Sequence, residues 1–327
     1  MKTLQGLTRR VACGLALAAG AALAFGSSAA EAAYPEKPIR VIVPTQAGGG
    51  MDSVARIFQR YFDENDLLGQ KMVVVNMDGA GGTIGTRAVR DAEPDGYTIG
   101  MWHEGLITSN VMGVADFDHT AFELLGVTGY GDLGFGVGKD SPYQTFDALL
   151  DAARAEPNSV KCATNIGLPV HFVPLMVQDE AGVEFRYVQV GGGAKRFPSV
   201  VAGHTDFAIF GAIEMVKWAD ADLRPIVLFA DERNSLLPDT PTAKELGVDV
   251  VARANRIWLA PEGTPPEIVE HLENAFRTAM ADPVIQEQMV DQGLVPVFVE
   301  PDALVTELDW WAAKAGPLVA KARELQQ

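Results

Sequence analysis

The chain has 327 residues and a formal net charge of −17, from 43 acidic and 26 basic residues. This charge excludes routine nucleic-acid binding, because the phosphate backbone would be repelled. Once the export segment described next is removed, about 295 residues remain, which exceeds one typical hydrophobic core and predicts two domains.

Residues 1–32 have the pattern of a secretory signal peptide. A basic start precedes an apolar run over residues 11–25, and small residues follow it. The run is shorter than the ~20 apolar residues that span a bilayer, which favours a cleaved signal over an uncleaved anchor. Two small-x-small tripeptides, at 28–30 and 30–32, fit the cleavage rule, and the ordered protein is expected to begin at Tyr34. The mature protein is therefore expected to work outside the cytoplasm.

Cysteine and catalytic patterns give no sign of a cross-link, a metal centre or an enzyme. Only Cys162 remains after cleavage, so no intramolecular disulfide can form, and its apolar neighbours predict a small buried residue. The sequence lacks a G-x-S-x-G elbow, an H-E-x-x-H helix, a P-loop and paired cysteines for zinc. We therefore expect no metal and no cofactor, and the enzyme interpretation is weakened.

The first third of the mature chain alternates strands and helices. The predicted order is strand 39–44, glycine loop 48–50, helix 54–62, strand 72–75, glycine loop 79–82, helix 84–90 and strand 97–101. Strands that alternate with helices predict a parallel sheet.

A change of composition marks the middle of the chain, where residues 124–137 alternate glycine with apolar residues and predict extended crossing strands. A second α/β series follows, with helix 146–150, strand 160–163, a helix from about His171, strand 226–229, a return through 250–260 and helix 265–279. Two crossings between lobes are thus expected. The predicted division is 33–136 with 251–327 as lobe 1, and 137–250 as lobe 2.

Two glycine loops are candidate anion sites. Residues 79–85 fail the dinucleotide fingerprint, because its third glycine would fall on Ile84. A glycine turn into a helix start still lets backbone N–H groups approach an anion. Each loop alone is more often only a tight turn. Two such loops in consecutive strand–loop–helix units favour an anion-binding site, because adjacent parallel strands place both loops at one edge of the sheet.

Two histidines are further candidates, and each has a functional and a structural interpretation. His103 follows the third predicted strand at that edge, where it could form an acid–base pair with Glu104 or simply line a cleft. His171 stands at a helix start, where it could contact a ligand or hydrogen-bond locally.

An ordered set of short motifs resembles the substrate-binding proteins of tripartite tricarboxylate transporters, also called Bug or TctC proteins. The motifs are PIRVIVP at 38–44 with AGGGMDSVAR at 47–56, NMDGAGG at 76–82, DGYT at 95–98, PDTPT at 238–242 with ELG at 245–247, and APEGTP at 260–265. The resemblance covers nearly all of the mature chain.

The resemblance implies an α/β, bilobed periplasmic-binding-protein fold of type II-like form, with two Rossmann-like lobes and a ligand cleft between them. It further implies a periplasmic monomer that captures a small organic carboxylate and passes it to a separate membrane permease of the tripartite tricarboxylate type. Family members hold a ligand carboxylate between the two glycine loops, largely through backbone groups and water.

Combining the loops with the resemblance gives a set of predicted ligand-binding residues. They are Gln46, Ala47, Gly48, Gly49, Asp52, Gly79, Ala80, Gly81, Gly82, Thr83 and His103 from lobe 1, Thr164, Asn165, His171, Gly191, Gly192, Phe210 and Gly211 from lobe 2, and Arg256 from the crossing segment.

The chain departs from the family where the distal end of the ligand would lie. Val190 replaces a frequent tyrosine, and Lys195 replaces the glutamate of the tricarboxylate branch. Lys195 and Arg256 are candidate cationic partners, which favours a dicarboxylate or an aromatic carboxylate over an amino acid. An alternative is that Arg256 pairs with Glu214 across the hinge.

Two other function classes stay open at this point. The chain could present its ligand-bound form to a membrane signalling partner, or the bilobed fold could host enzyme chemistry, as this architecture can.

Overall fold

The computed structural model describes residues 34–324, so the expected signal peptide at 1–32 lies outside the described residues. The chain divides into two units, Met1–Glu36 and Lys37–Gln327, and the second is one compact body. Within residues 34–324, no helix has the length and apolar character that crossing a membrane requires.

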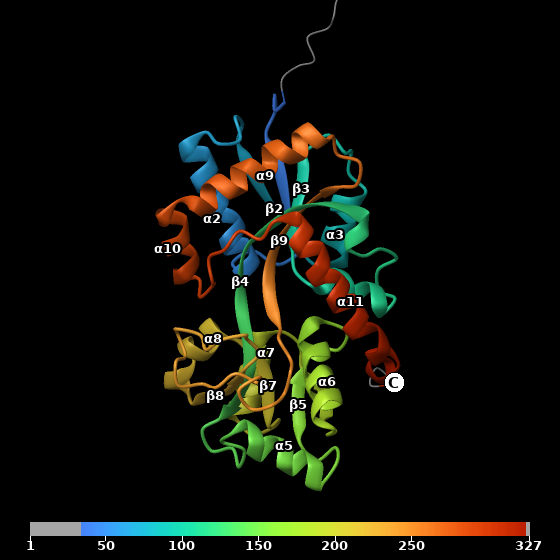
Figure 1. The fold of residues 1–327 in the computed structure, drawn as a ribbon, viewed down its shortest axis with the longest axis vertical. Helices are drawn as coiled ribbons and strands as arrows, with labels where there is room; N and C mark the ends of the chain where they lie inside the picture. Colours follow the sequence, from blue (N-terminus) through green and yellow to red (C-terminus); the bar gives the residue numbers. More distant parts are fainter. Residues whose placement is uncertain (1–33, 325–327) are drawn as a thin grey trace, which may run out of the picture. The chain divides into compact units, whose positions relative to one another are not determined.

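The first sheet begins with the three parallel strands that the sequence predicts (Figure 1). They are β1 (Ile39–Val43), β2 (Met72–Asn76) and β3 (Thr98–Trp102), connected through α2 (Gly50–Asn65), the short turn η1 (Ala80–Gly82) and α3 (Thr83–Arg90). β1 lies between β2 and β3, and Val43 pairs with Asn76 at the end of its strand. The two glycine loops therefore leave the sheet at the same edge, as expected.

Two long strands connect the two sheets. β4 (Phe122–Gly138) pairs with β9 (Arg253–Pro261) as far as Asp132, and from Leu133 onward it pairs with β7 (Phe207–Gly211) and β8 (Leu223–Leu228). β9 also pairs with β3. The predicted extended segment is confirmed. All pairings of β4 and β9 are antiparallel, because these strands carry the chain out and back, so each sheet combines parallel and antiparallel strands.

The second sheet repeats the parallel arrangement. β5 (Lys161–Thr164) lies between β6 (Arg186–Gln189) and β7 and is parallel to both. Its helices are α5 (Phe146–Ala155), α6 (Pro169–Ala181), α7 (Gly193–Val201) and α8 (Ala212–Lys217). α6 starts at Pro169, two residues before the predicted start, because proline suits the first turn of a helix.

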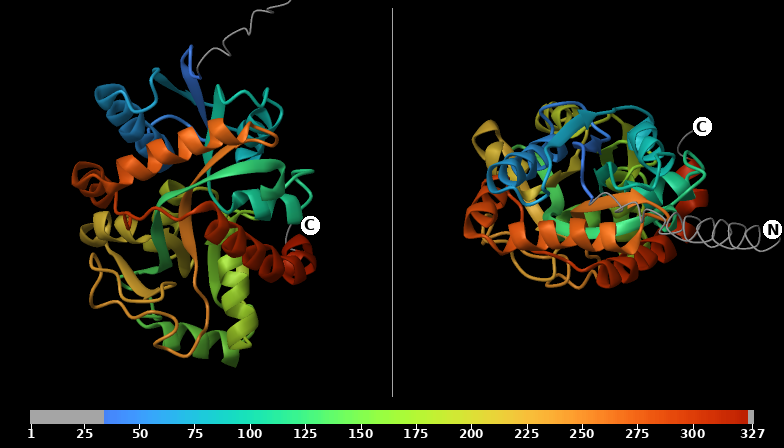
Figure 2. Two further views of the ribbon diagram at one scale, coloured as in Figure 1. Left: turned by 45° about the horizontal axis from the view of Figure 1, so that its top comes forward. Right: turned by 90° about the horizontal axis from the view of Figure 1, so that it is seen from above.

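The remaining helices lie outside the α/β repeats. They are α4 (Gly105–Val111), α9 (Pro266–Ala281), α10 (Pro283–Asp291) and α11 (Pro301–Glu324), with short turns η2 (His119–Ala121) and η3 (Ala219–Ala221). α9 confirms the helix predicted after Pro265. The sequence patterns did not predict α11, which packs against α4 near the first sheet and against α6 near the second (Figure 2).

Each sheet has its own aromatic core. In the first, Trp258 lies 5.4 Å from Phe58, measured between ring centroids. In the second, Phe135 lies 4.5 Å from Phe207. Cys162 is fully buried, as predicted. Two separate cores agree with the chain length. The lobe boundaries at 136/137 and 250/251 stay a prediction, and β4 exchanges its partners between Asp132 and Leu133.

Candidate functional site

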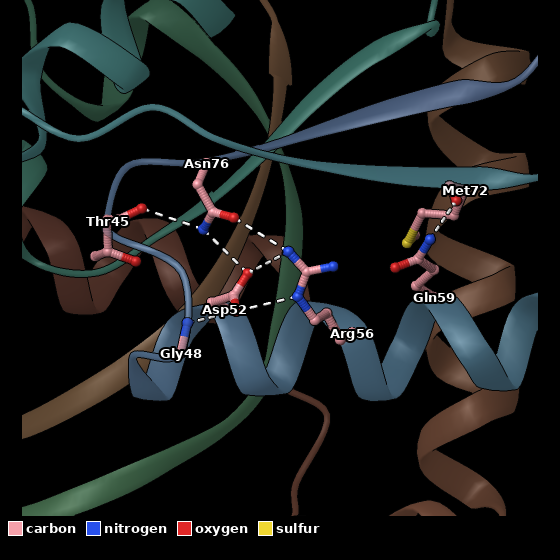
Figure 3. A network of polar contacts seen from close by, with 7 residues as sticks. All are labelled: Thr45, Gly48, Asp52, Arg56, Gln59, Met72 and Asn76. Carbon is pink, nitrogen blue, oxygen red and sulfur yellow. Dashed lines mark hydrogen bonds and ion pairs between the residues drawn. The ribbon is translucent and has the colours of Figure 1, made fainter.

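The first glycine loop is held in shape by Asp52 (Figure 3). One oxygen of this buried carboxylate accepts the Gly48 N–H at 2.8 Å and Nε of Arg56 at 3.0 Å, and the other accepts the Asn76 amide at 3.0 Å. Asn76 also donates to the carbonyl of Thr45. Burial by itself raises the pKa of Asp52, but these hydrogen bonds outweigh it and hold the pKa below its usual value. Both oxygens are thus engaged in fixing the loop.

The donors that this loop offers are the backbone groups at the start of α2. The first N–H groups of a helix have no acceptor within the helix, and its N-terminus carries partial positive charge. Gly50 and Met51 form that first turn. A Cβ placed on Gly50 would lie only 3.9 Å from Nη2 of Arg256, so the helix start and this guanidinium are neighbours.

The second glycine loop packs tightly between the two sheets. Gly81 and Gly82 have φ values of +64° and +92°, which glycine adopts without strain. A Cβ on Gly82 would come within 2.1 Å of the Trp102 ring, and one on Gly81 would lie 3.0 Å from the Leu168 side chain of the second lobe. The loop therefore requires glycine for close packing as well as for its backbone conformation.

His103 directly follows β3 and is a neutral hydrogen-bond donor. Its ring stacks on Trp102 with centroids 4.0 Å apart, and Nδ1 accepts the Gly105 N–H at 2.9 Å. Burial, with the charge of Arg256, lowers the pKa of His103 to about 3. Since Nδ1 is an acceptor, the proton of the neutral ring sits on Nε2.

Arg256 and Glu104 lie together at the base of the site. Nη1 of Arg256 donates to the carbonyl of Ala254 at 2.7 Å. Burial lowers the pKa of Arg256 to about 10 and raises that of Glu104 to about 8. Glu104 accepts the backbone N–H of Asn255. At neutral pH Arg256 is charged and Glu104 is protonated, which leaves a net positive charge at this point.

The start of α2, His103 and Arg256 face a cavity of about 490 Å³, within the ~300–1,000 Å³ range of small-molecule sites. A smaller cavity of about 150 Å³ shares His103, Leu133, Val170, Arg196 and Ala254 with it. Further walls of the larger cavity come from both sheets: Gly50, Met51, Phe210, Gly211, Glu214, Lys217, Trp218 and Arg256.

The structure brings together only part of the predicted site. His103, Phe210, Gly211 and Arg256 line the larger cavity, and His103, Asn165 and Gly192 line the smaller one. The other predicted residues are not among those that line either of these two cavities: Gln46, Ala47, Gly48, Gly49, Asp52, Gly79, Ala80, Gly81, Gly82, Thr83, Thr164, His171 and Gly191. Ligand contact by any of these residues stays a prediction.

Two of the predicted residues that line neither cavity have structural partners. The Thr164 hydroxyl donates to the carbonyl of Val170 at 3.0 Å. His171 is fully buried, its Nδ1 accepts the Gly167 N–H, and burial lowers its pKa to about 4. This is the local hydrogen bond that the sequence offered as an alternative for His171.

Two expectations about charge are corrected by the geometry. Lys195 is exposed and is not among the residues that line either cavity, whereas its neighbour Arg196 lines both. Glu214 accepts the Gly211 N–H at 2.9 Å, and within residues 34–324 it forms no ion pair with Arg256. The hinge pair is therefore wrong. Arg196 could have been found from helical spacing, because it stands four residues before the buried Val200.

Two α/β sheets joined by one long shared strand, with a helix start, a histidine and two arginines around one cavity, define a two-lobed periplasmic-binding-protein fold. Family comparison agrees with this class. The profile of the Tripartite tricarboxylate transporter family receptor, TctC, matches residues 54–323. The chain belongs to this family of solute-binding receptors.

Similar proteins are found by sequence and by structure. A UPF0065 protein of Pseudomonas sp. strain P51 is 30% identical over 88% of each chain. The crystal structure of a TctC solute-binding protein from Polaromonas has a TM-score of 0.74 at 26% identity and covers 88% of this chain and 99% of its own. MatC from Rhodopseudomonas palustris, solved with bound malate, has a TM-score of 0.73 at 23% identity, with 88% of this chain and 100% of MatC covered.

Proposed function

We propose that this chain is an exported periplasmic protein that binds a small organic carboxylate in the cavity between its two sheets and delivers it to a separate tripartite-type membrane permease. It does so as a monomer, without cofactor and without chemistry on the ligand. The observation that carries the proposal is the gathering of anion donors at one cavity. The start of α2, the neutral His103 and the half-buried Arg256 all face it.

Local donors explain how so acidic a protein can bind an anion. The global field of a chain with net charge −17 opposes an approaching carboxylate. Inside the cavity the ligand meets a helix N-terminus and a guanidinium, and both favour negative charge at short range. Malate, the ligand of the MatC structure, is a carboxylate of the proposed kind.

The cleft between two lobes also suggests how binding is signalled. We propose lobes at 33–136 with 251–327 and at 137–250, which close on the ligand through β4 and β9. A ligand that contacts both sheets favours the closed form, which the permease then recognises.

The proposal is tested first by mass spectrometry of small molecules released from the denatured, purified protein, and then by a thermal-shift screen of carboxylates. A cognate ligand at 100 times its dissociation constant stabilises the native state by ~2.7 kcal/mol. That corresponds to a rise in melting temperature of roughly 5–10 °C.

The screen also has outcomes that contradict the proposal. If mono-, di- and tricarboxylates all leave melting unchanged while another chemical class raises it, the ligand class is wrong. Turnover of the bound ligand would point to an enzyme. Capture of a membrane signalling protein rather than a permease in a pull-down would point to a sensor.

A further inference from the structure

A second arginine lines the cavity from the side of the second sheet. Arg196 belongs to α7 and is only 5% exposed. Its Nη1 donates to the carbonyl of Gly191 at 2.8 Å, and its Nη2 donates to the carbonyl of Ile209 at 3.0 Å. These two bonds fix the plane of the guanidinium beside the cavity. Among residues 34–324, Nε of Arg196 is buried and has no hydrogen-bond partner.

Arg256 shows the same features on the side of the first sheet. It lies in β9, lines the same cavity, and donates through Nη1 to its own strand. Its Nε is also buried without a partner in the described part of the chain. The two arginines thus line one cavity from opposite lobes, and each has a buried Nε without a hydrogen-bond partner among the described residues.

The charges around these arginines do not neutralise them by direct contact. In residues 34–324 neither guanidinium has a carboxylate oxygen within 4.0 Å, although seven other arginines do. Glu214 acts on Arg196 through its charge, but its hydrogen bond goes to the Gly211 N–H. Glu104 lies near Arg256 and is protonated at neutral pH. Lys217, which also lines the cavity, adds a further positive charge.

A charge held away from water without a partner is costly, so a site with one buried and one half-buried arginine, neither paired with a carboxylate, is suited to a ligand that supplies two counter-charges. Arginine is well matched to this task, since its planar fork binds a carboxylate through two parallel hydrogen bonds. The cavity of about 490 Å³ has room for a short chain between two such groups.

We propose that Arg196 is a specificity-determining residue that binds the second acidic group of the ligand, so that the cavity selects a small dicarboxylate with one carboxylate at Arg256 and the other at Arg196. This inference rests on the proposed carboxylate-binding function and names the residue that sets its preference.

The test is a calorimetric titration with matched ligand pairs that differ only in the second acidic group. Succinate is compared with butyrate, and adipate with hexanoate, on the wild type and on Arg196→Gln. For at least one pair, the wild type is expected to bind the dicarboxylate about 10- to 150-fold more tightly, the range for one charge-assisted hydrogen bond. In Arg196→Gln this preference is expected to fall to within about threefold, while affinity for the monocarboxylate is kept.

Two further variants make the result specific. Arg186→Gln removes an exposed positive charge from β6 of the same sheet and is the matched control, with the dicarboxylate preference retained. Arg196→Lys keeps the charge but not the planar fork and is expected to keep only part of the preference. If Arg196→Gln does not fold, Arg196→Lys decides, and a full preference in that variant overturns the proposal.

Other outcomes separate this inference from the proposed function. Equal weakening of mono- and dicarboxylates in Arg196→Gln, or an unchanged preference, overturns the role of Arg196 and leaves carboxylate binding standing. Loss of the preference in Lys195→Gln instead would assign it to the neighbouring residue. If the wild type binds no carboxylate, the proposed function fails and this inference fails with it.

Discussion

The backbone N–H of Asn255 donates a hydrogen bond of 3.2 Å to Oε1 of Glu104. The side chain of Asn255 donates to Glu307 at 2.7 Å, so one residue of β9 hydrogen-bonds two acidic side chains. Burial raises the pKa of Glu104 to about 8, and the charge of Glu307 adds to this rise. Burial therefore favours the neutral form of Glu104, which leaves the positive charge of Arg256 available to a ligand anion.

Stability is expected to depend on pH through Glu104. Its ordinary pKa is 4.5, so between about pH 4.5 and 8 the folded protein keeps a proton that the unfolded chain releases. Stability from this group is complete below pH 4.5 and is lost as pH rises through this window. Glu104→Gln should flatten that decline, measured as melting temperature at pH 5, 6, 7 and 8.

Comparing the wild type with Glu104→Gln separates the pH dependence due to Glu104 from that due to His103. The pKa of His103 is lowered to about 3, so its contribution is present above pH 6.5 and is lost as pH falls. Both proteins share that trend. Parallel pH profiles for the wild type and Glu104→Gln would show that Glu104 ionises normally in the fold.

Replacement of Gly81 by valine is expected to abolish ligand binding while the protein stays folded. A β-branched side chain strains a backbone with φ of +64°, at a cost of about 1–3 kcal/mol, and its Cβ would meet Leu168 across the cleft. Gly203→Val is the matched control. It imposes the same kind of strain at φ of +72°, with no described atom within 4 Å of the added Cβ.

The two variants are compared by thermal melting and by titration with the carboxylate found in the screen. Similar melting temperatures with binding lost only in Gly81→Val support the loop as part of the site. Wild-type affinity in Gly81→Val would place the ligand elsewhere.

Asp52 is expected to act by shaping the first loop. Asp52→Ala leaves the Gly48 N–H, Arg56 and Asn76 without their shared acceptor, which should destabilise the fold by about 1–3 kcal/mol and weaken binding. Asp63→Ala, on the same helix, removes the acceptor of the Met72 N–H without touching the loop. Denaturant unfolding and titration should show lost stability in both variants but weakened binding only in Asp52→Ala. Equal affinities would separate Asp52 from the site.

Arg256→Ala is expected to weaken binding about 10- to 150-fold, because it removes a charge-assisted hydrogen bond to the ligand. Glu214→Ala should leave affinity unchanged or raise it, since it removes a negative charge from the cavity wall and breaks no ion pair with Arg256. Calorimetric titration of both variants with the identified ligand measures this. Parallel weakening in both would indicate an effect on lobe closure, and full affinity in Arg256→Ala would remove this residue from the site.

Local patterns in the sequence were sufficient for much of the fold. Runs of β-branched residues followed by glycine loops predicted β1, β2 and their helices, because a strand and a turn are specified by neighbouring residues. The shared edge of the two glycine loops also followed, since consecutive parallel strands leave a sheet on the same side. The family was recognisable from the order of these motifs.

The composition of the cavity depended on tertiary structure. Lys195 and Arg196 are adjacent cations in the sequence, and only the packing of α7 turns Arg196 toward the cavity and Lys195 toward solvent. Likewise, the sequence predicts that Asp52 contacts the ligand. In the structure, its carboxylate instead accepts a hydrogen bond from Asn76 at the end of the next strand. The sequence by itself therefore determined the strands, the loops and the family, which depend on short-range patterns. Which side chains face the ligand was decided by contacts between residues far apart in the chain, because each one depends on how a helix or strand is rotated against its neighbours.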